Sequence, residues 1–235
     1  FIFYCIYYHN YLFNVIRQGV VMALFLFSIK YIIDRKFLQV LIISVISSLI
    51  HLSGFLILFA YFLFRIKLKN RISMLLMILL SIIIWKTGLG EICFFYILDM
   101  IPIIKLPKLE LYLKVFTYHH TTINILQRLL ILLPLIYFYP SLSKEKTFST
   151  LFNIYFWGTV VYLTFGFFGL FIARINMFFR ILEIILIPIL YEKVKNKNQK
   201  IIIQVPIVAW GLTVLTWVYY KEAYYPFKTI FGDIL

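Results

Sequence analysis

Long apolar runs dominate the sequence, and short charged or polar turns separate them. A helix needs about 20 apolar residues to cross a bilayer. It also satisfies its backbone hydrogen bonds within lipid, which an open sheet does not. The pattern therefore predicts transmembrane helices and no strands. The predicted spans cover residues 12–33, 125–139, 148–173, 177–191 and 201–220, with further apolar runs at 37–64 and 72–85.

The first residues, 1–8, are apolar and begin without methionine or a charged segment. They are expected to be the end of a helix that starts earlier, so the chain would be a fragment lacking N-terminal helices. No stretch of residues 1–235 is polar enough for a soluble domain. The sequence thus predicts one transmembrane domain with an all-α, polytopic helix bundle.

The composition agrees with lipid as the solvent. Hydrophobic residues make up 63% of the 235 residues and charged residues 14%, against about 45–50% and about 25% in soluble domains. The net charge of +14 comes from small basic clusters between apolar runs. Such clusters suit turns that meet an anionic leaflet, so nucleic acid is not an expected partner. The two cysteines are too few for a disulfide framework or a metal site.

The basic clusters predict the orientation of the chain, because positive charge marks the cytoplasmic side of a membrane. Clusters that share this face must be separated by an even number of crossings. Two apolar runs separate the second cluster from the third, and two more separate the third from the fourth. These three clusters would therefore share the cytoplasmic face. The four clusters lie at residues 34–36, 65–71, 144–146 and 192–200.

The apolar run at 37–64 breaks this rule if it is one helix. Its 28 residues would form a helix about 42 Å long, and one basic cluster would lie on the wrong side. Folded at His51, the run becomes a re-entrant pair of short helices that enters and leaves through the same face. Irregular backbone at that depth needs cover from protein or a polar cavity. One strongly tilted span remains the alternative.

This orientation places several arginines, and an extracytoplasmic loop at residues 87–124, on the outer side. A charge in a membrane is costly unless it reaches the interface, pairs or faces water. Arg180 has Glu183 three residues further on, which suits an ion pair. The alternative is that guanidinium groups bind an anionic ligand, because their rigid fork of donors matches phosphate oxygens. The outer arginines are Arg17, Arg128, Arg174 and Arg180.

Histidines are the candidates for proton transfer. His51 lies at the predicted turn of the re-entrant pair, where it would either hydrogen-bond a neighbouring helix or act in a cavity. His119 and His120 lie in the outer loop with acidic residues upstream, and either could be a general base or simply a solvated side chain. The sequence has no phosphate-binding loop, dinucleotide fingerprint or metal-ligand spacing. No cofactor and no metal is therefore expected.

Three short elements resemble a known family. Arg17-Gln18 opens a span, His51 follows in the next long apolar run, and Arg174 precedes a Phe-Phe pair near the penultimate helix. Together they resemble the EpsG family of bacterial polysaccharide polymerases, which is similar to the Wzy O-antigen and capsule polymerases. Phe178 stands where the family usually has tyrosine, so a hydroxyl is lost. The resemblance covers residues 10–230.

The resemblance implies a glycosyltransferase-type enzyme in the bacterial cytoplasmic membrane. It would polymerise undecaprenyl-pyrophosphate-linked oligosaccharide repeat units at the outer face, with lipid pyrophosphate as leaving group. Arg17 and Arg174 would contact the pyrophosphate, Arg128 and Arg180 are further candidates, and His51 would shape the cavity or transfer a proton. Other expected partners are the bilayer, a chain-length regulator and other polysaccharide-assembly proteins.

Three other functions remain open from the sequence. A transporter or flippase of lipid-linked sugars would carry polar residues through the full membrane depth, whereas here they concentrate in the predicted outer half. An organellar respiratory-chain subunit would place charges along a mid-membrane proton path, and His51 alone fits that. A membrane-bound acyltransferase would also use a histidine in or near the membrane.

Overall fold

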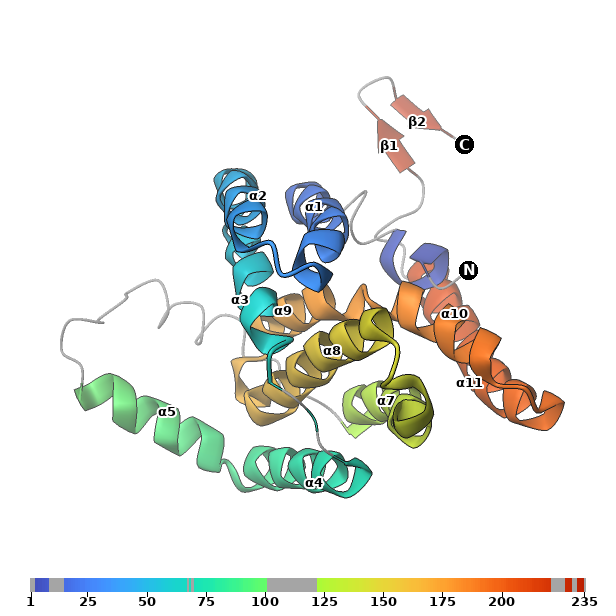
Figure 1. Ribbon diagram of the computed structural model, residues 1–235. Coiled ribbons are helices and arrows are strands. Elements are labelled where there is room, and N and C mark those ends of the chain that lie inside the picture. The colour runs from blue at the N-terminus through green and yellow to red at the C-terminus, as the bar shows by residue number, and fades with distance from the viewer. Residues whose placement is uncertain are drawn as a thin grey trace.

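The computed structural model describes residues 3–8, 15–66, 68, 70–100, 122–220, 227–229 and 232–234. The helices among them form an α-helical bundle (Figure 1). Two three-residue strands, β1 (Phe227–Thr229) and β2 (Gly232–Ile234), pair antiparallel after the last helix. The helices are η1 (Phe3–Tyr8), α1 (Ile16–Ile33), α2 (Phe37–Ile50), η3 (Leu52–Gly54), α3 (Phe55–Leu63), α4 (Arg71–Thr87), α5 (Leu89–Met100), α7 (Thr122–Leu142), α8 (Lys146–Thr164), η5 (Gly166–Phe168), α9 (Leu170–Arg180), α10 (Glu183–Lys193) and α11 (Lys197–Tyr220).

Several of these helices are long and apolar enough to cross a membrane. Among the described residues three qualify alone, namely Ile16–Ile33, Thr122–Leu142 and Lys197–Thr216. A fourth candidate is α4 together with the first part of α5, a pair bent by 75°. The predicted all-α, polytopic fold is confirmed, and the protein is a membrane protein.

Helix α8 forms the centre of the bundle, and α4, α7 and α9 pack against it (Figure 1). Its rings Phe148, Phe152 and Phe156 are fully buried and follow one another at helical spacing, with centroids 5.7 and 6.0 Å apart. Helix α2 lies at the periphery instead and exposes large aliphatic side chains such as Leu38 and Ile42. Apolar surface of this extent needs lipid or a partner to cover it.

The long apolar run before the second basic cluster folds back on itself, as predicted. His51 is extended, with φ −157° and ψ 139°, and α3 returns alongside α2. Near this turn the Ser44 hydroxyl donates a hydrogen bond to the Gly54 carbonyl at 2.9 Å. At the far end of the pair the Tyr61 hydroxyl donates to the Arg35 carbonyl at 3.2 Å. The two helices therefore form a hairpin that begins and ends on one side of the bundle, and a single continuous span is ruled out.

Gly54 explains how the hairpin closes so tightly. A Cβ atom at this position would overlap the backbone nitrogen of Ser48 and lie 2.8 Å from the Cβ of Ser47. Backbone atoms cannot move aside as a flexible side chain can, so any larger residue would push α3 away from α2.

The predicted span at 148–173 is wrong. Helix α8 ends at Thr164, the chain turns through η5, and α9 packs back along α8. Gly169 at this turn has φ 53°, a left-handed conformation that glycine adopts without a steric cost. The turn is missed in the sequence because its other residues are phenylalanines, which read as membrane-spanning. The predicted span at 177–191 is correspondingly the two helices α9 and α10, broken at residues 181–182.

The predicted outer loop at 87–124 is partly helical. Helix α5 occupies Leu89–Met100, and α7 begins at Thr122. Figure 1 shows α5 leading away from the rest of the bundle. Its ring Phe94 nevertheless contacts the turn after α8, with its centroid 4.6 Å from that of Phe168.

The basic clusters gather at one end of the bundle, as the orientation argument requires. The Tyr61 hydroxyl, which donates to the Arg35 carbonyl, also accepts from the Arg65 guanidinium at 2.8 Å, so it joins the first two basic turns. Glu145 in the α7–α8 turn forms an ion pair of 3.6 Å with Lys193 at the end of α10. We call this part of the molecule the basic end; it comprises the turns at residues 34–36, 65–66, 143–146 and 192–196.

Candidate functional site

The tip of the α2–α3 hairpin presents His51. Helix α2 has 14 residues, so the tip lies about 21 Å from the basic end at 1.5 Å per residue. The half-buried ring is fixed by Ser53, whose backbone N–H donates to Nδ1 at 3.1 Å and whose hydroxyl lies 2.8 Å from the same nitrogen. A nitrogen that accepts from a backbone N–H carries no proton, so the proton of the neutral ring is on Nε2.

A second element of the site joins the start of α1 to α9. Gln18 is buried, and its Nε2 donates to the backbone carbonyl of Arg174 at 3.2 Å. The guanidinium groups of Arg17 and Arg174 are carried by exposed side chains on either side of this bond. Arg17 and Arg174, which are 157 positions apart in the sequence, are thereby held on one side of the bundle.

The hairpin tip completes this arrangement, because η3 packs against α1. Arg17 and Arg174 both lie close enough to His51 to act electrostatically on its ring. The three residues that carry the family resemblance lie on α1, the α2–α3 turn and α9, and these elements meet in one place. We call Arg17, His51 and Arg174 the cationic site.

Contacts between α8 and α9 position Arg174. The Asn176 side chain donates from Nδ2 to the Gly158 carbonyl at 3.1 Å and is buried. Gly158 also allows the Phe179 ring to lie against α8, since a Cβ there would be only 2.6 Å from the Cβ of Phe179. Sequence reasoning missed Asn176 and Gly158. The available signal was an amide and a glycine within aromatic runs, which is typical of a close helix contact.

Phe178, at the position where the resemblance predicts a tyrosine, links α9 to α1. Its ring is fully buried and stacks on Phe25 with centroids 4.5 Å apart. The Phe178 ring thus contributes packing between α9 and α1, the helices that carry Arg174 and Arg17.

Arg180 belongs to a separate, buried polar cluster. Its Nε donates to Glu183 at 2.9 Å, and both side chains are buried. The same carboxylate accepts from the hydroxyls of Tyr7 and Tyr155, each at 3.0 Å. This is the i, i+3 ion pair that the sequence left open as an alternative to ligand binding.

Arg128 lies in the same buried region. Its guanidinium is 4.6 Å from the centre of the Tyr162 ring and acts electrostatically on Arg180. Its Nε and Nη1 make no hydrogen bond to any described residue. The cluster holds two guanidinium groups against one carboxylate, so it keeps an excess positive charge inside the bundle. The four arginines predicted to lie on the outer side thus divide into two exposed and two buried.

The loop histidines cannot be placed relative to this site, because His119 and His120 lie outside the described residues. The described part of the outer segment contributes one exposed carboxylate, Glu91, near the start of α5. Three or more His, Cys, Asp or Glu side chains do not come together anywhere within the described ranges.

Fold and site together define a polytopic membrane bundle whose basic turns lie at one end and whose separate cationic site lies at the tip of a helical hairpin. A family model matches this chain over residues 1–229, and the chain belongs to the EpsG family. The predicted resemblance is confirmed. The family makes the protein a membrane component of polysaccharide assembly. No curated protein and no solved structure matches the chain.

Proposed function

We propose that the protein polymerises undecaprenyl-pyrophosphate-linked oligosaccharide repeat units at the outer face of the bacterial cytoplasmic membrane. The observation that carries the proposal is the meeting of Arg17, His51 and Arg174 at the end of α1 opposite the basic turns. By the positive-inside rule the basic end faces the cytoplasm, so the cationic site faces outward. Two exposed guanidinium groups there suit a ligand with a diphosphate at the membrane surface.

The reaction joins a hydroxyl of one lipid-linked unit to the first sugar of the growing chain. The hydroxyl oxygen attacks the anomeric carbon, the carbon–oxygen bond to pyrophosphate breaks, and its electron pair leaves with the lipid pyrophosphate. The hydroxyl proton passes to a base. Negative charge develops on the leaving oxygen, and positive groups held in place before the reaction stabilise that charge most effectively.

Each residue of the cationic site has a role in this scheme. Arg17 and Arg174 bind the pyrophosphate of the donor and neutralise the charge that develops on it. His51 donates from Nε2 to a phosphate oxygen, because Nδ1 is already occupied by Ser53. His119 and His120 are the proposed candidates for the base. A chain-length regulator and other polysaccharide-assembly proteins are the proposed partners.

Single replacements Arg17→Ala and Arg174→Ala, introduced into a strain that lacks its own gene, test the proposal. We expect each to reduce polymer formation by about 10²–10³-fold, as loss of one preorganised charge-stabilising group does. Gel analysis of the surface glycan should then show single repeat units in place of long chains, with the protein still present in membranes.

Lys86→Ala is the matched control. Lys86 is an exposed cation in the last turn of α4, a helix that packs mainly against α5, α7 and α8, whereas the cationic site lies on α1, the α2–α3 turn and α9. This variant should therefore polymerise normally. Long chains of wild-type abundance in both arginine variants would refute the proposed role of the site, and equal losses in all three variants would point to general charge effects.

A further inference from the structure

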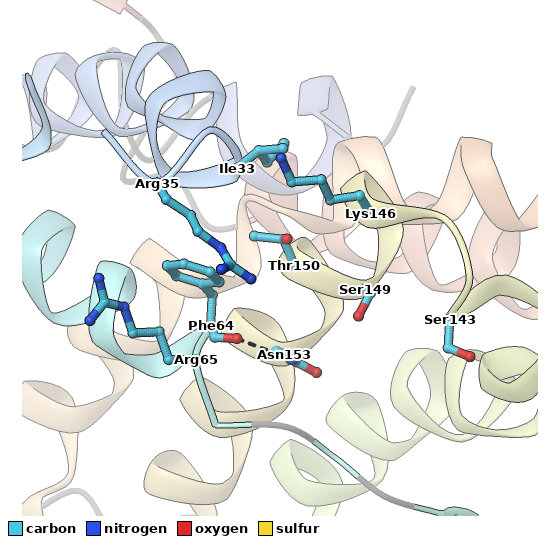
Figure 2. Close-up of a pocket in the computed structure, with 9 residues that line it drawn as sticks. All are labelled: Ile33, Arg35, Phe64, Arg65, Ser143, Lys146, Ser149, Thr150 and Asn153. Atoms are coloured by element: carbon cyan, nitrogen blue, oxygen red, sulfur yellow. Dashed lines mark hydrogen bonds between the residues drawn. The ribbon is translucent and has the colours of Figure 1, made fainter. Parts of the chain in front are cut away.

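A pocket of about 600 Å³ opens at the basic end (Figure 2). It lies at the base of the α2–α3 hairpin, whereas His51 of the cationic site lies at the tip. Its cations come from three different turns: Arg35 between α1 and α2, Arg65 after α3, and Lys146 at the start of α8. Figure 2 shows the Arg35 guanidinium reaching past Phe64 toward α8. Hydroxyl and amide groups line the remaining wall, contributed by Ser143, Ser149, Thr150 and Asn153.

The acidic residues nearby do not neutralise these cations. Asp34 pairs with Lys36 at 4.0 Å, and Glu145 pairs with Lys193 at 3.6 Å. In the described ranges, none of the ion pairs involves a cation of the pocket. The pocket therefore concentrates positive charge and suits an anionic occupant.

Asn153 adds a second, independent requirement on the occupant. The residue is 4% exposed, and its Nδ2 donates to the Phe64 carbonyl at 3.2 Å. The opposite assignment of the amide would bring two acceptors together, so Oδ1 is the atom left without a partner. A buried acceptor without a donor is costly. An occupant that carries a hydroxyl or ammonium donor next to its negative charge would satisfy both features.

The backbone of Arg35 supports a binding role for the pocket. Its φ of 59° is left-handed, which is uncommon for a side chain of this size. Such strained positions recur at ligand clamps, where the surrounding structure holds them. Here the Tyr61 hydroxyl holds the turn by donating to the Arg35 carbonyl at 3.2 Å while it accepts from Arg65 at 2.8 Å.

Exposed apolar side chains flank the pocket and indicate that its occupant has an apolar part. Phe62 and Ile66 border Arg65, Phe37 follows the Arg35 turn, and each is more than 40% exposed. A free phosphate would gain nothing from these residues, whereas lipid acyl chains would cover them. Basic pockets between membrane helices on the cytoplasmic side are suited to anionic headgroups.

We infer that this pocket binds the phosphodiester headgroup of an anionic lipid of the cytoplasmic leaflet, one with hydroxyl donors beside the phosphate, such as phosphatidylglycerol. Arg35 and Lys146 contact the phosphate, and Asn153 Oδ1 accepts from a headgroup hydroxyl. The site is separate from the cationic site, and the inference does not depend on the proposed polymerase activity.

The test measures lipid retention by native mass spectrometry after release of the protein from nanodiscs with equal phosphatidylglycerol and phosphatidylcholine. We expect phosphatidylglycerol on the wild-type protein. The double variant Arg35→Gln with Lys146→Gln should retain at least about tenfold less phosphatidylglycerol, because it loses two basic contacts to the lipid at the membrane surface. The matched control is Lys36→Gln with Lys195→Gln, which removes the same charge from the basic end outside the pocket and should retain the wild-type amount.

Two further probes decide the chemistry of the occupant. Phosphatidylmethanol has the same phosphodiester charge without headgroup hydroxyls, so it should be retained less than phosphatidylglycerol. Glycerophosphoglycerol, the deacylated headgroup, should fail to displace the lipid. Equal losses in both double variants would overturn the site. Equal retention of phosphatidylmethanol would overturn the role of Asn153, and displacement by the deacylated headgroup would show a soluble phosphodiester as ligand instead of a lipid.

Discussion

The two ring nitrogens of His51 have different surroundings, and this difference determines which nitrogen of the neutral ring carries the proton. Nδ1 faces Ser53, which donates to it from the backbone at 3.1 Å. A base needs a free lone pair on the ring, and in this geometry the free nitrogen, Nε2, carries the proton. His51 is therefore suited to donate a hydrogen bond to a phosphate oxygen. The sequence left two roles open, shaping the cavity or transferring a proton, and this geometry favours the first.

Replacements that mimic one nitrogen at a time separate the roles of donor and base. The amide nitrogen of glutamine lies near the position of Nε2, so His51→Gln should keep polymer formation within about tenfold of wild type, whereas His51→Ala should lose about 10²–10³-fold. The measurement is the amount of long-chain glycan on gels at equal protein level. If glutamine is as inactive as alanine, the histidine acts through proton transfer.

The buried ion pair is a second feature of single residues that can be tested. Glu183→Gln removes the charge that compensates Arg180 and leaves two guanidinium groups inside the bundle. Breaking a buried pair from one side costs about 3–5 kcal/mol, so the variant should have a much lower melting temperature in detergent or fail to accumulate. Glu192→Gln, at an exposed position of the same helix, should melt like the wild type.

At the scale of helices, sequence patterns located most spans and failed where a turn is made of apolar residues. The α2–α3 hairpin could be predicted because two basic clusters bracket one run that is too long for a single crossing. The α8–α9 turn could not, because Phe165, Phe167 and Phe168 have the hydropathy of a span. Glycine at 166 and 169 was the available signal, and its meaning depends on the packing of α9 against α8.

The hairpin itself gives a prediction at this scale. Gly54→Ala places a methyl group against the backbone of α2 at Ser48, and overpacking of this kind costs about 1–3 kcal/mol. The variant should melt at a lower temperature and should lose polymer formation, because the hairpin tip carries His51.

Gly88→Ala is the comparison for that variant. Gly88 has φ 71°, but a Cβ there meets no atom within 4 Å, so only backbone strain of about 1 kcal/mol is added. Its melting temperature should therefore fall only slightly, and polymer formation should persist. Equal loss of polymer in both variants would contradict a specific role for close packing at Gly54.

At the scale of the whole molecule, the pattern of charges predicted more of the architecture than hydropathy did. The rule that basic turns share one face predicted the folded hairpin, which the structure has, and it places the four candidate arginines on the outer side, which stays a prediction. It could not separate Arg17 and Arg174 from Arg128 and Arg180, since burial depends on which helices pack together. It also gave no sign that Arg35, Arg65 and Lys146 form one pocket, because their turns meet through tertiary contacts such as that of Tyr61.

The orientation of the molecule is a prediction that one labelling experiment tests. Native Cys93 is exposed on α5, beyond the outer end of α4, so an impermeant maleimide should modify it from outside intact cells. In a Cys93→Ser background, Lys36→Cys and Ile66→Cys should both react only after the membrane is opened, because the hairpin returns both positions to the cytoplasmic face. Labelling of either position from outside intact cells would show that the basic end faces away from the cytoplasm. The cationic site would then face the cytoplasm, away from the repeat units that it is proposed to join.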